Sequence, residues 1–170
     1  MSEIKKHVIS VIIDNEFGAL ARVVELFSAR GYNIDSLTVA TTQSEKVSRI
    51  TITTHGSDKT VDLICKLLKR IVPVHYAAEL TRSEGYIERE LALVQIISAK
   101  EKRDEAIKIM ENYRSQIIDI DGDSTVFEVI GNSQKIEEIL SILQNYGLAT
   151  VSRTGIAAGF KGRKRLDEIS

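Results

Sequence analysis

Several residue types and segments that define other protein classes are scarce or missing in this sequence. Cys65 is its only cysteine, so no disulfide can form within the chain. No apolar run approaches the length of a membrane span or of a secretory signal. The 23 basic and 24 acidic residues nearly balance, so no overall field draws the protein onto nucleic acid or anionic lipid. We therefore expect a cytoplasmic protein without nucleic-acid or membrane partners.

The chain also has a single proline, Pro73. The strand predicted within the stretch VPVHYAAEL opens at this proline, and a proline at the first residue of a strand is typical of a sheet edge. The apolar fraction, 43% of 170 residues, is ample by comparison. A chain of this length and composition can fold around one large or two small cores.

The first 80 residues alternate between strand and helix patterns. Three β-rich stretches predict strands, the last two joined by the polar TQSEK of a hairpin: His7–Ile13, Ile34–Thr41 and Val47–Thr54. A helix is predicted from Ala19 to Arg30, with Gly31 as its terminating glycine. Its apolar stripe is Leu20, Val23, Val24 and Phe27. Ser57 or Asp58 can cap a second helix, and the strand at Pro73 completes a βαββαβ order.

The same order recurs in the second half of the chain. A strand at Glu90–Ser98 precedes a helix with the stripe Arg103, Ala106, Ile107 and Met110. QIIDI and STVFEVI form a hairpin turned at Gly122, Asn132 or Ser133 caps the last helix, and Leu148–Ile156 is the final strand. The sequence thus predicts an α+β fold of two tandem ferredoxin-like domains, residues 1–82 and 83–170. The linker lies near Thr81–Tyr86, and the tail is expected to fray from Gly159 onward.

The first predicted strand is apolar on both faces. Two helices cover one face of its sheet, which leaves Val8 and Ile12 on the other. An exposed apolar patch and an edge strand both invite a partner. We therefore expect at least a homodimer joined through the N-terminal domains.

The turn from Asp14 to Leu20 is the most informative loop for function. Gly18 allows a ligand to approach the backbone, and the amides that follow it lie at a helix N-terminus, which favours a carboxylate. A simpler interpretation is that Asn15 caps the turn and Gly18 relieves strain. Asn33 has the same ambiguity, because it is either a turn residue or a polar group beside a ligand at a subunit edge.

Other reactive residue types do not form a recognisable site. His7, His55 and His75 lie on separate elements without metal-ligand spacing, so we assign no metal site. Cys65 fits the apolar pattern of the second helix as a packed thiol. The three aspartates at 119, 121 and 123 fit a turn better than a calcium loop, and the basic run at 161–165 fits a solvated terminus. We assign no catalytic residue.

Longer segments closely resemble one protein family. HVISVIIDNEFGAL, ARVVELFSARG and YNIDSLTVA resemble the N-terminal ACT domain of the acetolactate synthase (acetohydroxyacid synthase) small subunit. SRITITT, IERELALVQI, RDEAIKIMENYRSQIIDI and VSRTGIAAG extend the resemblance over nearly the whole chain. The resemblance implies an ACT domain followed by a second ferredoxin-like domain.

The resemblance also implies a regulatory function. Such small subunits act on a catalytic large subunit, and thiamine diphosphate, Mg²⁺ and FAD are expected only on that partner. Valine, or another branched-chain amino acid, would bind between two ACT domains as a feedback inhibitor. The residues implied at this site are Asn15, Gly18, Ala19, Leu20, Asn33 and Ile34. Many ACT domains carry proline where this chain has Phe17, a difference that could narrow the pocket.

The sequence leaves three alternative functions to weigh. The chain could be a stand-alone ACT protein that senses an amino acid and acts on a different partner. An RNA-binding domain shares the βαββαβ order, but VSRITITTH offers no aromatic platform for bases. A ferredoxin-like enzyme would need a converging nucleophile, acid and oxyanion site, which these residues do not form.

Overall fold

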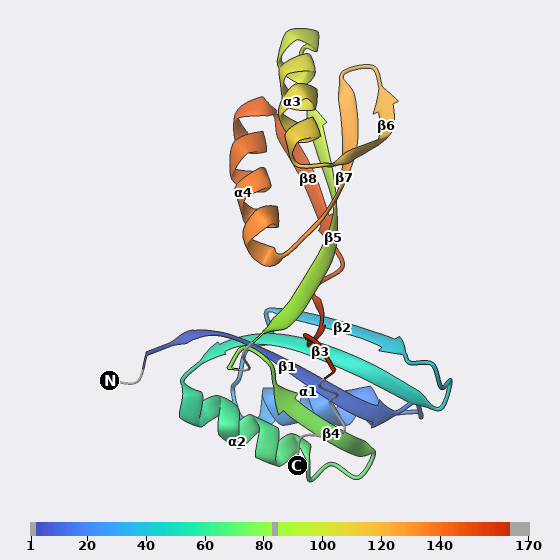
Figure 1. Cartoon of the computed structure of the whole chain (residues 1–170), viewed down its shortest axis with the longest axis vertical. Helices are drawn as coiled ribbons and strands as arrows, with labels where there is room; N and C mark the ends of the chain where they lie inside the picture. The colour runs from blue at the N-terminus through green and yellow to red at the C-terminus, as the bar shows by residue number, and fades with distance from the viewer. Residues whose placement is uncertain (1–2, 83–84, 164–170) are drawn as a thin grey trace. The chain divides into compact units, whose positions relative to one another are not determined.

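The computed structural model describes residues 3–82 and 85–163 as two compact units (Figure 1). The N-terminal unit runs to Ile87 and includes a later segment that begins at Ile156, whereas the C-terminal unit is Glu88–Gly155. Each unit contains one antiparallel sheet and two α-helices. This arrangement confirms the predicted α+β fold with two ferredoxin-like βαββαβ motifs.

The N-terminal unit has the strand order β2-β3-β1-β4, with both helices on one face of the sheet (Figure 1). Its elements are β1 (Lys5–Asp14), α1 (Ala19–Ala29), β2 (Ser36–Thr41), β3 (Val47–Gly56), α2 (Asp58–Leu68) and β4 (Val74–Glu79). β1 pairs with β3 and β4, which leaves β2 and β4 as the edges. The edge position predicted from Pro73 is therefore confirmed.

The apolar stripe predicted on α1 divides into two parts. Val23 and Phe27 are buried in the core together with Ile9, Ile50 and other apolar residues of the sheet and α2. Leu20 and Val24 remain 36% and 40% exposed. The helix buries the ridge centred on Val23, so its neighbouring ridge is free to contact something else.

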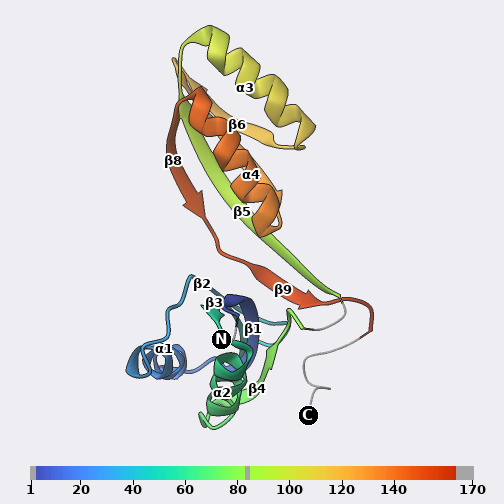
Figure 2. The ribbon, with the colours of Figure 1, turned by 90° about the vertical axis from the view of Figure 1, so that its left-hand side faces the viewer.

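The C-terminal unit has the strand order β6-β7-β5-β8. Its elements are β5 (Tyr86–Ile97), α3 (Lys100–Asn112), β6 (Gln116–Asp121), β7 (Ser124–Gly131), α4 (Ser133–Leu143), a 3-10 turn (Gln144–Tyr146) and β8 (Leu148–Arg153). Both helices lie on one face of this sheet (Figure 2) and enclose Val94, Phe127 and Leu143. No helix in the described ranges 3–82 and 85–163 has the length and apolarity needed to cross a membrane.

The residues that begin and end the helices agree with the prediction from sequence. Ser57 accepts a hydrogen bond from the Thr60 amide and caps α2, while Asn132 accepts from the Lys135 amide and caps α4. Gly31 and Gly147 follow their helices with φ values of 65° and 83°. A side chain at Gly147 would also meet the carbonyl oxygen of Ile97 at 2.2 Å, so this turn requires glycine.

The outer face of the N-terminal sheet is not an open patch, contrary to the prediction for Val8 and Ile12. Val8 is fully buried and Ile12 is half-buried. They pack with Ala78 and Leu80, and with Tyr86, Ala158 and Phe160 of two later segments. A stretch that was expected to be surface tail provides part of this cover.

That cover comes from β9 (Ala157–Phe160), a short strand that follows β8 and pairs with β5 (Figure 2). The amide of Lys161 donates to the carbonyl of Gly85 at 2.9 Å. Fraying from Gly159 onward is therefore wrong for Gly159 to Lys161. The division of the chain also differs from the predicted domains 1–82 and 83–170, because β9 packs with the N-terminal unit. Residues 83–84 of the linker and 164–165 of the basic run lie outside the described residues.

Candidate functional site

The turn between β1 and α1 leaves helix amides without partners. Gly18 has φ 82°, in the left-handed region, and α1 starts at Ala19 without a side-chain cap. The Ala19 amide donates to the carbonyl of Glu16 at 3.3 Å. Among the described residues, the amides of Gly18 and Leu20 have no acceptor. Two of the three amides predicted to hold a carboxylate are therefore available, and the helix dipole reinforces them.

The side chain of Asn15 is held in one orientation by the β2–β3 hairpin. Its Nδ2 donates to the carbonyl of Glu45 at 2.8 Å, and its backbone amide donates to the carbonyl of Lys46 at 2.7 Å. The carboxamide oxygen Oδ1 has no donor among the described residues. It can therefore accept a hydrogen bond from an ammonium group.

Asn33 and Ile34 lie at the opposite end of the same sheet. The carbonyl of Asn33 accepts from the Thr54 hydroxyl at 2.6 Å, and Thr54 pairs with His7 in β1. Asp14, where the Gly18 turn begins, pairs with Val47. Seven residue steps separate these positions along the strands, which is roughly 23 Å at 3.3 Å per residue. One chain therefore does not bring the six predicted ligand residues together.

The two ends nevertheless carry similar polar groups. Asn33 donates from Nδ2 to the carboxylate of Asp35 at 2.7 Å, which leaves its Oδ1 as an acceptor, as in Asn15. Ile34 packs at the margin of the core. The end with the Gly18 turn has the exposed side chain of Leu20, and Phe17 is fully exposed beside it. The expected narrowing of the ligand pocket by Phe17 stays a prediction.

Each histidine pairs with a carboxylate. His55 contacts Asp35 at 2.7 Å, and His75 contacts Asp14 at 2.6 Å. Both are partly exposed, as expected for histidines on surface strands, whereas His7 is fully buried. Within residues 3–82 and 85–163, no group of three or more His, Cys, Asp and Glu side chains could hold a metal ion.

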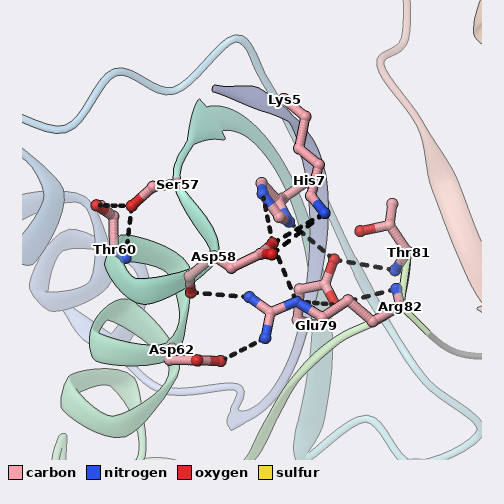
Figure 3. A network of polar contacts seen from close by, with 9 residues as sticks. All are labelled: Lys5, His7, Ser57, Asp58, Thr60, Asp62, Glu79, Thr81 and Arg82. Atoms are coloured by element: carbon pink, nitrogen blue, oxygen red, sulfur yellow. Dashed lines mark hydrogen bonds and ion pairs between the residues drawn. The ribbon is translucent and has the colours of Figure 1, made fainter. Parts of the chain in front are cut away.

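His7 belongs to a polar network that the sequence did not indicate (Figure 3). Its Nδ1 lies 3.1 Å from the carboxylate of Glu79, which also accepts from the amides of Thr81 and Arg82. Arg82 donates to Asp62 at 2.7 Å. The network connects β1, α2 and the residues after β4. No signal could have identified it from sequence, because its members are up to 77 residues apart.

Two side chains in this region, Asp58 and Cys65, have a shifted pKa. A hydrogen bond from Lys5 holds the pKa of the Asp58 carboxyl below its usual range. Burial raises the pKa of the Cys65 thiol to about 11, and the nearby carboxylates of Glu79 and Asp62 contribute to the rise. At neutral pH Cys65 is a protonated, partly buried thiol packed against the core. The prediction that it packs as an apolar residue is confirmed.

The fold and this turn define a class of protein. The N-terminal unit, with its β2-β3-β1-β4 sheet and glycine turn into α1, is an ACT-type domain, and a second domain of the same topology follows it. Residues 9–76 match the family described as the AHAS small subunit-like ACT domain. Residues 89–159 match the family described as the small subunit of acetolactate synthase.

Full-length relatives agree with the two matches. A probable acetolactate synthase small subunit of Archaeoglobus fulgidus is 38% identical over 160 residues, 94% of this chain and 99% of that protein. The acetolactate synthase small subunit of Bacillus subtilis is 35% identical over 161 residues, 94% of this chain and 93% of that protein. The crystal structure of the Thermotoga maritima small subunit superposes with a TM-score of 0.84 at 30% identity, covering 94% of this chain and 99% of that one. The chain belongs to the acetolactate synthase small subunit family.

Proposed function

We propose that this chain is the regulatory partner of a thiamine-diphosphate-dependent acetolactate synthase catalytic subunit. In this proposal it raises the activity of that subunit and transmits feedback inhibition by valine, which binds between two ACT domains. The observation that carries the proposal is the division of the binding groups between opposite ends of one sheet. Thiamine diphosphate, Mg²⁺ and FAD would bind only on the catalytic partner. The cytoplasmic location stays a prediction.

A symmetric dimer would reunite the two ends. β2 is an edge strand that runs in the same direction as β1, with the antiparallel β3 between them. If two copies pair their β2 edges about a two-fold axis, the sheets continue in antiparallel order. The end of one sheet with Asn15 and Gly18 then lies beside the end of the other with Asn33 and Ile34. The exposed side chains of Leu20, Val24 and Val39 would be covered in such a dimer.

The groups at that junction match the chemistry of an amino acid. The amides of Gly18 and Leu20 would bind the carboxylate of valine at the α1 N-terminus. The Oδ1 atoms of Asn15 and the partner subunit's Asn33 would accept from its ammonium group. Leu20 and the partner subunit's Ile34 would contact the isopropyl group. One methylene in an apolar pocket is worth about 1–3 kcal/mol, so leucine and isoleucine should bind more weakly than valine.

Feedback requires that valine bind two states of the complex unequally. In this proposal, the ligand-free dimer supports the active catalytic subunit, and valine favours a dimer geometry that does not. A coupling free energy of about 1–3 kcal/mol changes affinity about 5- to 150-fold, which is enough for a feedback response. By reciprocity, the active catalytic subunit should weaken valine binding by the same factor.

The test is calorimetric titration of L-valine into the purified chain and into Gly18→Asp. We expect saturable binding that the variant loses, because a carboxylate beside the ligand's own carboxylate repels it. Gly122→Asp is the matched control. Gly122 also has positive φ and open space where a Cβ would lie, but it belongs to the hairpin of the C-terminal unit. Equal valine affinity in wild type and Gly18→Asp would contradict the proposed site.

The partner is tested separately. Addition of the purified chain to an acetolactate synthase catalytic subunit should raise its activity, and valine should reverse the increase. Gly18→Asp should activate equally well but resist valine. Valine binding without any effect on the catalytic subunit would instead indicate a stand-alone amino-acid sensor with another partner.

A further inference from the structure

The β2–β3 hairpin does more than connect two strands, because its tip holds Asn15. The carbonyls of two consecutive tip residues, Glu45 and Lys46, accept the side-chain and backbone N–H groups of Asn15 at 2.8 and 2.7 Å. The tip is 30 residues from Asn15 in sequence. The position of the Glu45 carbonyl therefore determines how the Asn15 carboxamide is oriented.

The hydroxyl of Thr42 adds to the backbone bonds that close the tip. Oγ1 of Thr42 accepts from the Ser44 amide at 3.2 Å, and its one proton lies within donating distance of two carbonyls, Val47 at 3.1 Å and Ser44 at 3.3 Å. The Thr42 amide also donates to the Val47 carbonyl at 2.9 Å. These bonds join the two ends of the tip. The second side chain involved is Ser44, whose Oγ accepts from the Lys46 amide at 3.4 Å.

We propose that Thr42 is a positioning residue for the effector site, acting through the hairpin tip on the Asn15 carboxamide. The proposal rests on the function proposed above, in which Asn15 Oδ1 accepts from the ligand's ammonium group. The carboxamide can rotate by half a turn and exchange its oxygen and nitrogen. The Glu45 carbonyl can accept only from nitrogen, so it fixes Oδ1 on the other side, available to the ligand.

Thr42 does not need to touch the ligand for this effect. Without its hydroxyl, the Ser44 amide loses its acceptor and the Val47 carbonyl keeps only the Thr42 amide as donor. Two backbone bonds then hold the tip alone, from Thr42 to Val47 and from Val47 to Ser44, and the residues between them can relax. The Glu45 carbonyl then moves from Asn15, and the carboxamide loses its single orientation. The energy lost is that of one hydrogen bond from Asn15 to the ligand, about 0.5–1.5 kcal/mol net. That loss corresponds to a roughly 2- to 13-fold weaker affinity for valine.

The experiment compares Thr42→Val with Thr42→Ser. Valine keeps the branched shape of threonine without the hydroxyl, whereas serine keeps the hydroxyl without the methyl group. By calorimetry, we expect Thr42→Val to bind L-valine about 2- to 13-fold more weakly and Thr42→Ser to match wild type. Ser44→Ala gives a second route to the same tip and should weaken binding by a smaller factor.

Nuclear magnetic resonance of the ligand-free protein provides a separate readout. The side-chain NH₂ signals of Asn15 should move in Thr42→Val and return to the wild-type position in Thr42→Ser. Unmoved signals in Thr42→Val would overturn the proposal, and so would equal loss of affinity in Thr42→Val and Thr42→Ser. If wild type binds no valine while the signals move as expected, the proposed effector fails but the link from Thr42 to Asn15 stands.

Discussion

The two units share one topology but treat the outer faces of their sheets differently. In the N-terminal unit, Phe160 and Tyr86 pack with Val8 on the face opposite the helices. In the C-terminal unit, Leu93, Ile97 and Ile130 are 36%, 47% and 51% exposed. Strand register places all three on the face opposite the core residue Val94. The βαββαβ pattern therefore determines the core between the sheet and its helices in each unit. Whether the opposite face of the sheet is buried depends on other segments of the chain.

The units also differ where their first helices begin. α1 follows a glycine in the left-handed region, whereas α3 follows Ala99 with an extended backbone. Neither helix has a side-chain cap. An asparagine held by a hairpin accompanies the glycine turn only in the N-terminal unit, among the described residues. In the proposed function, ligand binding therefore depends on one turn and its supports rather than on the shared topology.

The largest expected difference between the units concerns an ion pair of the C-terminal unit in which the carboxylate is buried and the arginine is partly exposed. There, Arg153 donates through Nε and Nη2 to the buried carboxylate of Glu90, which raises the pKa of Arg153. Arg153→Leu leaves Glu90 buried and unpaired. We expect the free energy of unfolding of this unit to fall by about 3–5 kcal/mol. Hydrogen exchange of C-terminal peptides should rise, with little change in the N-terminal unit.

The matched control for that variant is Glu137→Ala. Glu137 accepts from the same arginine at 2.5 Å but is largely exposed. An exposed ion pair contributes about 0–1 kcal/mol. If Arg153→Leu cost no more than Glu137→Ala, the Glu90 pair would not hold the unit together.

Alkaline pH should loosen the N-terminal unit selectively, through its only cysteine. The pKa of Cys65 is about 11 in the folded chain, against an ordinary value of 9.0. Because the folded pKa is the higher one, the stabilisation is complete below pH 9 and is lost as the pH rises toward 11. The loss should be about 2–3 kcal/mol. Urea unfolding from about pH 8 to 11 measures it, and Cys65→Ala should remove this part of the pH dependence.

The free energy of unfolding can be plotted against pH for wild type and for Cys65→Ala. If the two curves ran parallel between about pH 8 and 11, burial would not raise the pKa of the thiol. Lysines and tyrosines also titrate there, but they are common to both proteins. The difference between the two curves therefore isolates Cys65.

A smaller effect should follow from removing part of the cover on the N-terminal sheet. Phe160→Ala removes a half-buried ring that packs against Val8 and Leu80. Loss of part of a phenylalanine's burial should lower the free energy of unfolding by about 1–2 kcal/mol. Phe17→Ala, at a fully exposed ring, is the control and should be close to neutral. Equal effects of the two changes in urea unfolding would mean that β9 does not stabilise this unit.

Short-range patterns predicted most of the fold. Helix stripes, the caps Ser57 and Asn132, and the terminating glycines all act within one or two turns, so the sequence carries them locally. β9 was missed because Ala157–Phe160 is four residues long and has no periodic signal. Its partners, Gly85 and the face around Val8, are more than 70 residues away. Its burial depends on tertiary packing that no local pattern encodes.

The candidate site shows the same limit. The residue types made the turn with Asn15 and Gly18, and also Asn33, candidates for a ligand site, and that role stays a prediction. Their separation to opposite ends of the sheet follows from strand register, which requires the strand pairing to be known. The hydrogen bond from Asn15 to Glu45 could not be predicted, because its acceptor is a backbone carbonyl, which every residue type has.

The return of β9 has a consequence for the order in which the protein is made. Because its N-terminal unit is built from two stretches of chain separated by the whole C-terminal unit, synthesis completes the inner core of the first unit early and its outer face last. Domains generally fold as units in the order of synthesis. During synthesis, the sheet face around Val8 therefore lacks the cover of β9 until roughly 70 further residues, those of the C-terminal unit, have been made. Until β9 is made, the apolar side chains around Val8 lack part of their cover, and an exposed apolar patch is a site for aggregation.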